Sequence, residues 1–128
     1  MMRILIADDS ALVRRSVVAF LSSEPACEVC GEASGGQDGM RMVRELSPDL
    51  VLLDVSMPDM SGLEAARLLR EQVPHVKIII MSHHDPTQML PQALEAGAHA
   101  CVDKSRIATD LLPMIRSLTT SVPHPAAC

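Results

Sequence analysis

Several apolar segments in this sequence end on side chains that could take part in ionic or phosphoryl chemistry. These are Asp8 and Asp9, Asp54, Ser82, and Lys104. Two carboxylates about 5 Å apart repel by about 3 kcal/mol at an effective dielectric constant near 20, so a cluster of them requires a cation. Mg²⁺ prefers oxygen ligands and fits such a cluster. If the segments meet, Mg²⁺, Lys104 and Ser82 would hold a phosphoryl group, and Asp54 would be the nucleophile that accepts it.

The elements that must position these side chains alternate between short apolar runs and longer amphipathic ones, which predict strands and helices. The predicted strands span residues 3–8, 27–33, 49–54, 76–82 and 99–104. Helices are expected after each of the first three strands, ending near residues 22, 46 and 72, and a last helix over residues 107–118. Ser10 and Ser61 are suitable N-caps for two of these helices.

Five strand–helix units predict an α/β fold: a flavodoxin-like (βα)5, doubly wound, five-stranded parallel sheet with strand order 2-1-3-4-5. Ligands of such sheets bind at the carboxyl ends of the strands, where the strand order reverses. That point lies between the first and third strands, which end in Asp8, Asp9 and Asp54. The fold class therefore predicts that the polar side chains meet at one edge.

The fourth helix is ambiguous because Pro91 interrupts its pattern, and proline is tolerated only in the first turn of a helix. Either the helix begins near Leu90 and is short, or it begins at Pro86 and kinks. We expect fast amide exchange over residues 84–91, since Pro91 leaves little room for a stable helix ahead of it.

Length and charge limit the classes of function. The 128 residues fit one domain, expected over residues 1–118, with a flexible tail or linker over 119–128. The formal net charge of −5 argues against direct binding of nucleic acid, which needs a basic footprint. No apolar run is long enough to cross a membrane, and no secretory leader is apparent, so a cytoplasmic location is expected.

Two other motifs resemble binding or redox sites but are better explained as structural residues. Cys27 and Cys30 have a redox or zinc spacing, but they lie in a predicted strand where residues three apart face opposite sides, and no second ligand pair completes a zinc site. The loop at residues 34–39 contains glycines without dinucleotide-binding spacing. We interpret the cysteines as structural and the glycines as turn residues.

The sequence resembles the receiver domains of two-component response regulators (CheY-like). The matching stretches are ILIADDSALVRR, PDLVLLDVSMPDMSGLEA, IIIMS and ALEAGAHACVDKS, and the resemblance covers residues 3 to 118. It is strongest to receivers that precede LuxR-type helix-turn-helix domains, judging by SHHD and by the non-proline residue after Lys104.

The resemblance implies that Asp54 accepts a phosphoryl group from a phosphohistidine of a sensor histidine kinase or phosphotransfer protein. It implies Mg²⁺ binding by Asp9, Asp54 and the carbonyl of Ser56, with Asp8 assisting through water. Such a domain catalyses only its own phosphorylation and dephosphorylation. Phosphorylation then switches the surface formed by the fourth helix, fifth strand and fifth helix.

The resemblance also implies that a kinase docks on the first helix, where Arg14 and Arg15 are expected on the exposed side. A DNA-binding output domain beyond Cys128 is a further possible partner. His83, next to Ser82, is bulkier than the residue often found there and could narrow access to the site.

Three alternatives compete with this interpretation. Cys101 replaces the aromatic residue that many receivers use as a switch, which keeps a protein-binding pseudo-receiver open. A haloacid-dehalogenase-like phosphohydrolase would need an acidic residue two positions after Asp54, where Ser56 stands. A flavin-binding module would need an aromatic side chain to stack on the ring, and the chain has only Phe20.

Overall fold

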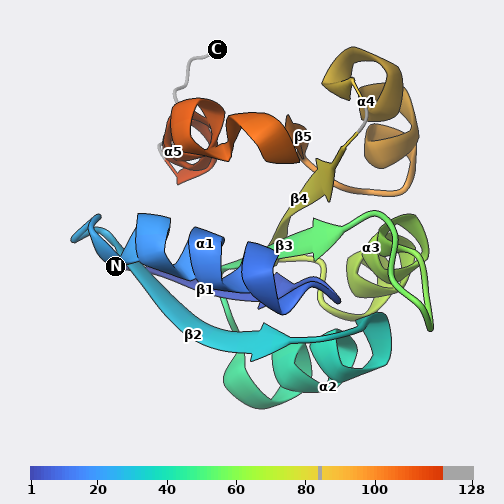
Figure 1. Ribbon diagram of the computed structural model, residues 1–128. Helices are drawn as coiled ribbons and strands as arrows, with labels where there is room; N and C mark the ends of the chain where they lie inside the picture. The colour runs from blue at the N-terminus through green and yellow to red at the C-terminus, as the bar shows by residue number, and fades with distance from the viewer. Residues whose placement is uncertain (84, 120–128) are drawn as a thin grey trace, which may run out of the picture.

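Strands and helices alternate along the chain in the computed structural model, which describes residues 1–83 and 85–119 (Figure 1). The strands are β1 (Met2–Ala7), β2 (Cys27–Ala33), β3 (Leu50–Asp54), β4 (Lys77–Ser82) and β5 (Ala100–Asp103). The helices are α1 (Ala11–Ser22), α2 (Gly36–Leu46), α3 (Gly62–Gln72), α4 (Pro86–Glu95) and α5 (Ile107–Thr119), with a 3₁₀ turn, η1 (Lys104–Arg106), before α5.

The strands form one sheet in the order β2-β1-β3-β4-β5, and each neighbouring pair is parallel. This confirms the predicted fold class and strand order. The carboxyl ends of β1 and β3 are neighbours, with Ala7 beside Leu53 in the register. Asp8 and Asp54 follow these two residues and therefore leave the sheet next to each other.

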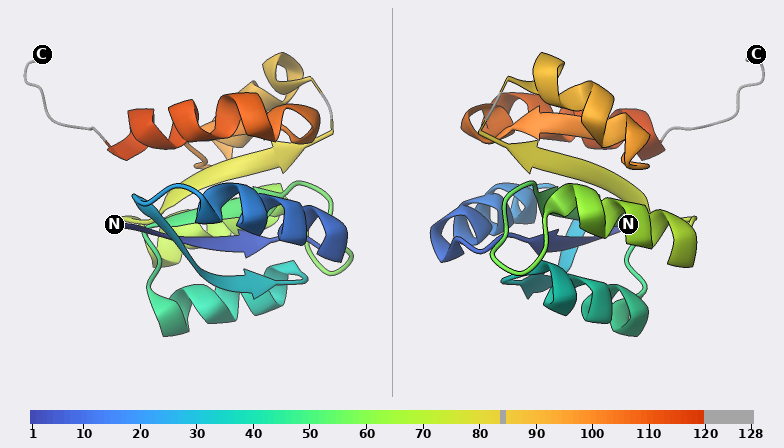
Figure 2. Two further views of the ribbon diagram at one scale, coloured as in Figure 1. Left: turned by 60° about the vertical axis from the view of Figure 1, so that its left-hand side comes forward. Right: turned by 90° about the vertical axis from the view of Figure 1, so that its right-hand side faces the viewer.

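Helices cover both faces of the sheet (Figure 2). Helices α1 and α5 pack on one face, where Val17 and Leu111 belong to the same buried cluster as Ile4 and Ile6 of β1. Helices α2, α3 and α4 pack on the other face against Leu5 and its neighbours. Successive residues of β1 thus enter opposite layers, as the alternation of a strand requires. Both layers are built from aliphatic side chains and methionine, and Phe20 is only partly buried.

The N-caps agree with the sequence prediction. The Ser10 hydroxyl accepts a hydrogen bond from the Val13 amide, and the Ser61 hydroxyl accepts one from the Glu64 amide. Each cap satisfies an amide of the first helical turn that has no partner within the helix.

Helix α4 begins at Pro86, so the start predicted at Pro86 is correct and the start near Leu90 is wrong. Because residues 86–90 are helical, the premise that Pro91 leaves little room for a helix ahead of it is wrong, while fast amide exchange there stays a prediction. Asp85 caps the helix by accepting from the Thr87 amide, and a proline in the first turn loses no helical hydrogen bond. His84, which the exchange prediction included, lies outside the described residues.

Strand β2 contains a β-bulge. Ile4 pairs with Val29, but Leu5 pairs with Gly31, so Cys30 has no Cα partner in β1. The bulge interrupts the alternation on which the argument about Cys27 and Cys30 relied. Cys27 still packs against the α1–α5 layer, and both cysteines are free thiols.

The end of the predicted domain lies close to the end of α5 at Thr119. The rest of the predicted tail, residues 120–128, lies outside the described residues, so the domain boundary stays a prediction. Among the described helices, none combines the length and the apolar character that crossing a lipid bilayer demands.

Candidate functional site

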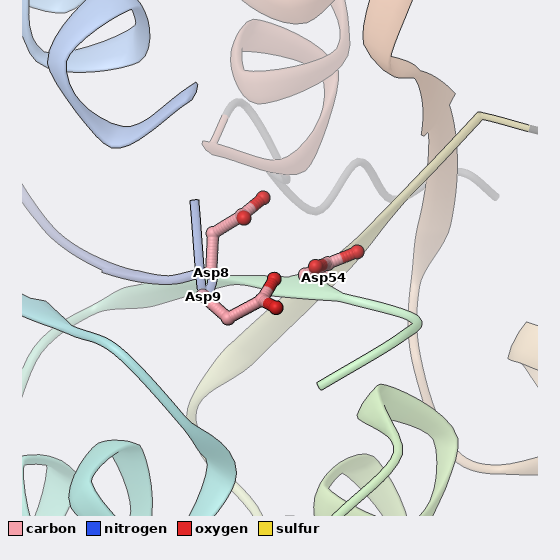
Figure 3. Close-up of side chains that lie close together, drawn as sticks. All are labelled: Asp8, Asp9 and Asp54. Carbon is pink, nitrogen blue, oxygen red and sulfur yellow. The ribbon is translucent and has the colours of Figure 1, made fainter. Parts of the chain in front are cut away.

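Three carboxylates converge at the carboxyl edge of the sheet. Asp8 and Asp9 follow β1, and Asp54 ends β3 (Figure 3). One oxygen of each lies within 4.8 Å of the others. Asp8 is 0% exposed and Asp54 is 3% exposed, whereas Asp9 is open to solvent. The predicted clustering of these residues is therefore present, and the cluster has one solvent-facing side.

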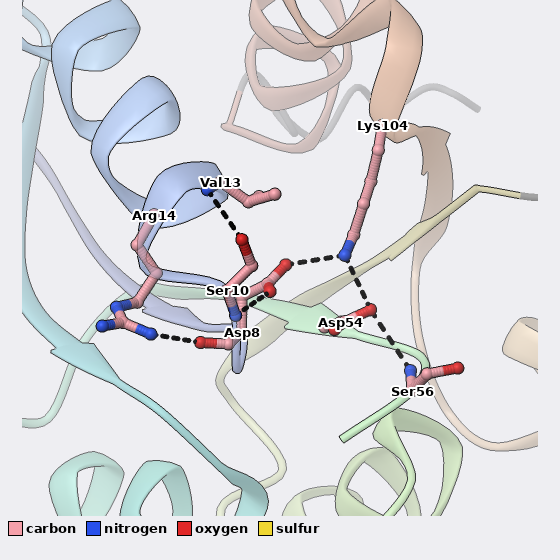
Figure 4. A network of polar contacts seen from close by, with 7 residues as sticks. All are labelled: Asp8, Ser10, Val13, Arg14, Asp54, Ser56 and Lys104. Atoms are coloured by element: carbon pink, nitrogen blue, oxygen red, sulfur yellow. Dashed lines mark hydrogen bonds and ion pairs between the residues drawn. The ribbon is translucent and has the colours of Figure 1, made fainter. Parts of the chain in front are cut away.

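Lys104, directly after β5, extends its side chain into this cluster (Figure 4). Its ammonium lies 2.8 Å from Oδ2 of Asp8 and 2.9 Å from Oδ1 of Asp54. Lys104 follows β5, which is separated from β3 by β4, and its ammonium contacts the carboxylates at the ends of β1 and β3. Removing Lys104 would leave two buried carboxylates without a cation, which is strongly destabilising.

Burial and neighbouring charges have opposite effects on the pKa values of Asp54 and Lys104. Burial raises the pKa of Asp54, and the charge of Asp8 adds to that effect, although the Lys104 ammonium and the Ser56 amide lower it. Burial lowers the pKa of Lys104, but its contacts with Asp8 and Asp54 outweigh burial and leave the pKa raised. Lys104 is therefore a fixed positive charge, while the ionised form of Asp54 is costly in this pocket.

Backbone contacts hold the acidic residues in place (Figure 4). The Ser10 amide donates to Oδ1 of Asp8 at 2.8 Å, and Arg14 donates from Nη1 to the Asp8 carbonyl at 2.6 Å. The Ser56 amide donates to Oδ1 of Asp54 at 3.2 Å. The expectation that Arg14 lies on the exposed side of its helix is wrong, because its side chain is only 18% exposed.

The loop between β3 and α3 is anchored to α2 by Asp59. Its carboxylate accepts hydrogen bonds from the amides of Gly36 and Gln37 at 2.9 and 3.0 Å, and these bonds lower the pKa of Asp59. At the other end of the loop, a Cβ on Gly62 would collide with the backbone carbonyl of Asp54. The end of β3 at Asp54 and the start of α3 at Gly62 are therefore packed closely against each other.

Ser82 and His83 complete this edge of the sheet. Ser82 ends β4 and is fully buried, and the preceding Met81 pairs with Asp54 in the register. His83 is exposed and lines a groove of about 400 Å³ together with Lys104 and residues of α1 and α5. The structure thus places Ser82 at the predicted edge and His83 on an open side of it.

The donor set fits a hard divalent cation. Oδ2 of Asp8 is buried and, apart from its ion pair with Lys104, has no hydrogen-bond partner among the described residues. Asp9 and Asp54 each present an oxygen within 4.8 Å of a carboxylate oxygen of Asp8. Carboxylate oxygens with one open side suit Mg²⁺, which takes one or two carboxylates and retains water.

Cys101 lies on the opposite face of β5 from Val102, within the α2–α4 layer. It is buried, and burial together with the charge of Asp103 raises its pKa to about 11. A thiol with this pKa is protonated at neutral pH and is a weak nucleophile. We interpret Cys101 as a packing residue that fills the position of the missing aromatic side chain.

The sequence analysis did not predict two contacts that hold the loops of this site, those of Arg14 and Asp59. Arg14 could have been suspected because it follows Asp8 by six residues and lies one turn into the helix. Asp59 carried no signal, since its partners Gly36 and Gln37 precede it by more than 20 residues.

Comparisons with known proteins agree with this geometry. The family model described as the response regulator receiver domain matches residues 4–116. The chain is 36% identical over 123 residues to the transcriptional regulatory protein LiaR of Bacillus subtilis, covering 96% of this chain and 58% of that protein. It is 31% identical over 114 residues to the response regulator protein VraR of Staphylococcus aureus, covering 89% of this chain and 54% of that protein.

Solved structures give the same result. A two-component response regulator of the LuxR family from Aurantimonas superposes with a TM-score of 0.86 at 30% identity, covering 92% of this chain and 84% of that one. The signal receiver domain of the putative response regulator NarL from Mycobacterium tuberculosis superposes with a TM-score of 0.86 at 29% identity, covering 94% and 98%.

The chain spans about half the length of the curated relatives it matches. The match therefore concerns the receiver portion of those regulators. This chain belongs to the family of response regulator receiver domains, the phosphoacceptor modules of two-component signalling.

Proposed function

We propose that Asp54 is the phosphoacceptor of this receiver domain. The observation that carries the proposal is the pairing of a buried Asp54 carboxylate with the Lys104 ammonium at 2.9 Å, beside two further carboxylates. A buried carboxylate that is costly to ionise, held next to a fixed cation, is typical of a functional site.

In the proposed phosphoryl transfer, Asp54 is the nucleophile, and Lys104 and Ser82 bind the phosphoryl oxygens. A carboxylate oxygen of Asp54 attacks the phosphorus of a phosphohistidine, forming an O–P bond as the N–P bond breaks. The imidazole nitrogen leaves with the electron pair of that bond, and the product is an acyl phosphate on Asp54. Lys104, already at the acceptor oxygen, pairs with the phosphoryl oxygens, and Ser82 donates a hydrogen bond to them.

We assign Mg²⁺ binding to Asp9, Asp54 and the carbonyl of Ser56, with Asp8 acting through water. When bound, the ion supplies positive charge that offsets the repulsion between the carboxylates and the incoming phosphate. The close approach of the three carboxylates and the solvent-facing position of Asp9 support this assignment.

The partners follow from the family. A sensor histidine kinase or a phosphotransfer protein would supply the phosphoryl group in the cytoplasm, and a LuxR-type DNA-binding domain would receive the signal. LiaR is a transcriptional regulatory protein, and the Aurantimonas regulator is of the LuxR family. The proposed route of the signal is the surface of α4, β5 and α5, without an aromatic switch at Cys101.

The test is phosphorylation by acetyl phosphate with Mg²⁺, read by intact mass and peptide mapping. Wild type should gain one phosphoryl group, and Asp54→Asn should gain none. Asp49→Asn is the matched control because it changes a carboxylate just ahead of the same strand, at its other end, and should be labelled like wild type.

Equal labelling of Asp54→Asn would reject Asp54 as the acceptor. If wild type gains no phosphoryl group from acetyl phosphate or from any phosphorylated kinase, the pseudo-receiver alternative is correct instead.

A further inference from the structure

Two adjacent arginines on α1 have different surroundings, although their sequence context suggests one role for both. Arg15 is exposed. Arg14 folds back toward the sheet, where its Nη1 donates to the Asp8 carbonyl at 2.6 Å and its Nε lies 3.2 Å from Oε1 of Glu32. Arg14 therefore joins α1, the end of β1 and β2, whereas Arg15 faces solvent.

The carbonyl that Arg14 contacts belongs to the peptide between Asp8 and Asp9. The Asp8 amide donates to the Ala33 carbonyl at 3.0 Å, and its carboxylate is held by Ser10 and Lys104. Arg14 supplies the remaining contact, on the carbonyl side. Since rotation of this peptide would swing Asp9 relative to Asp8, the Arg14 contact controls where the solvent-facing carboxylate lies.

We propose that Arg14 is a positioning residue for the divalent-cation site: by holding the Asp8 carbonyl, it orients the Asp8 and Asp9 carboxylates toward Asp54. This inference rests on the proposed function, because it assumes that these carboxylates bind the cation. It assigns Arg14 an internal role and leaves Arg15 as the arginine of this pair that a docking partner can reach.

The sign of the effect on cation affinity separates this role from simple electrostatics. Arg14 carries a positive charge, so removing it would by Coulomb's law strengthen the binding of Mg²⁺. Loss of a positioning contact acts in the opposite direction, because partners that orient metal ligands typically contribute about 10- to 100-fold to affinity.

The experiment is calorimetric titration of the whole chain with Mg²⁺, comparing wild type with three variants. Arg14→Ala should weaken binding by at least about tenfold. Arg15→Ala, which removes the same charge from the next residue, should bind as tightly as wild type or slightly tighter. Glu32→Gln removes the ion pair but leaves the bond to the Asp8 carbonyl, so its affinity should stay close to that of wild type.

Glu32→Gln also controls for stability. Both it and Arg14→Ala remove the charge pair between α1 and β2 and should lower the unfolding midpoint, but only Arg14→Ala should lower affinity. If Arg14→Ala binds Mg²⁺ as tightly as Arg15→Ala, or if Glu32→Gln weakens binding as much as Arg14→Ala, the proposed role is refuted.

A second readout does not depend on the cation. In metal-free protein the Ser10 amide is bonded to the Asp8 carboxylate, so its hydrogen exchange reports the order of this segment. Arg14→Ala should accelerate exchange at Ser10, Arg14→Lys should accelerate it less, and Arg15→Ala should leave it unchanged. Unaltered exchange in Arg14→Ala would refute the inference, even if wild type itself proved not to bind Mg²⁺ and the proposed function failed.

Discussion

The two edges of the sheet treat polar side chains in opposite ways. At the carboxyl edge, the Lys104 ammonium lies among the buried carboxylates of Asp8 and Asp54. At the amino edge, the Arg3 amide donates to Asp49 at 2.8 Å, and the Ile78 amide donates to Nδ1 of His99 at 3.1 Å. Polar groups at the amino edge bind backbone amides of the strands, whereas charged groups at the carboxyl edge contact one another.

A further contact at the amino edge also involves backbone groups, here as the acceptors. The Arg3 guanidinium donates to the carbonyls of Leu46 and Ser47, which end α2 and have no helical partner. Such contacts stabilise the fold. In the charged cluster at the other edge, by contrast, burial makes the ionised form of Asp54 less favourable.

The largest expected difference between the edges concerns lysine. Lys104→Met should lower the free energy of unfolding by about 3–5 kcal/mol, because it leaves two buried carboxylates without their cation. Lys77→Met at the start of β4 is the matched substitution at the amino edge and should change it by about 0.5 kcal/mol or less. Guanidinium unfolding followed by circular dichroism measures both, and similar losses would contradict the comparison.

Magnesium should act on one edge alone. At a Mg²⁺ concentration ten times the dissociation constant, the free energy of unfolding of wild type should rise by about 1.4 kcal/mol. Asp54→Asn should lose most of this gain, and Asp49→Ala should keep all of it. A gain that survives Asp54→Asn would place the cation elsewhere on the molecule.

Carboxylates around β3 should have effects of opposite sign. Asp54→Asn should raise stability in metal-free buffer at pH 7, because burial raises the pKa of Asp54 and so makes its ionised form less favourable folded than unfolded. Asp49→Ala should lower stability by about 1 kcal/mol, since it removes the acceptor of the Arg3 amide. The same direction of change in both variants would show that the edges do not differ.

The smallest expected effect is a pH dependence at the amino edge. Burial lowers the pKa of His99, with the charges of Lys77 and Arg70 adding to the effect, and the neutral ring is the form that accepts from Ile78. His99 should therefore contribute stability that is fully present above pH about 6.5 and declines as the pH falls below it.

Unfolding curves between pH 7.5 and 5 should show a shallower decline in His99→Gln than in wild type. The exposed His75 provides the control, because His75→Gln should leave the slope of wild type unchanged.

Much of the fold was predictable because local patterns and topology agree. Apolar runs ending on Asp8 and Asp54 placed two strand ends side by side once the strand order was known. Ser10 and Ser61 indicated where two helices begin, because each hydroxyl accepts a hydrogen bond from an amide only three residues further along the chain. Local chemistry of this kind is readable from sequence.

The supports of the site were less predictable because they depend on side-chain direction and distant neighbours. Arg14 and Arg15 are adjacent in the sequence, yet one contacts the Asp8 carbonyl and the other is exposed. Asp59 caps a helix that precedes it by more than 20 residues. Pro91 misled the sequence analysis because the helix begins five residues ahead of it, where Asp85 caps the first turn, and continues through the proline.

The bulge at Cys30 has a consequence for how copies of this molecule meet one another. Strand β2 is an outer strand of the sheet, and a straight outer strand offers its free backbone groups to any passing chain. A bulge typically bends its strand, and the exposed Glu28 beside it adds a charge that disfavours pairing with a second copy. These two features disfavour the addition of a further strand to the sheet at β2, and with it self-association through that strand.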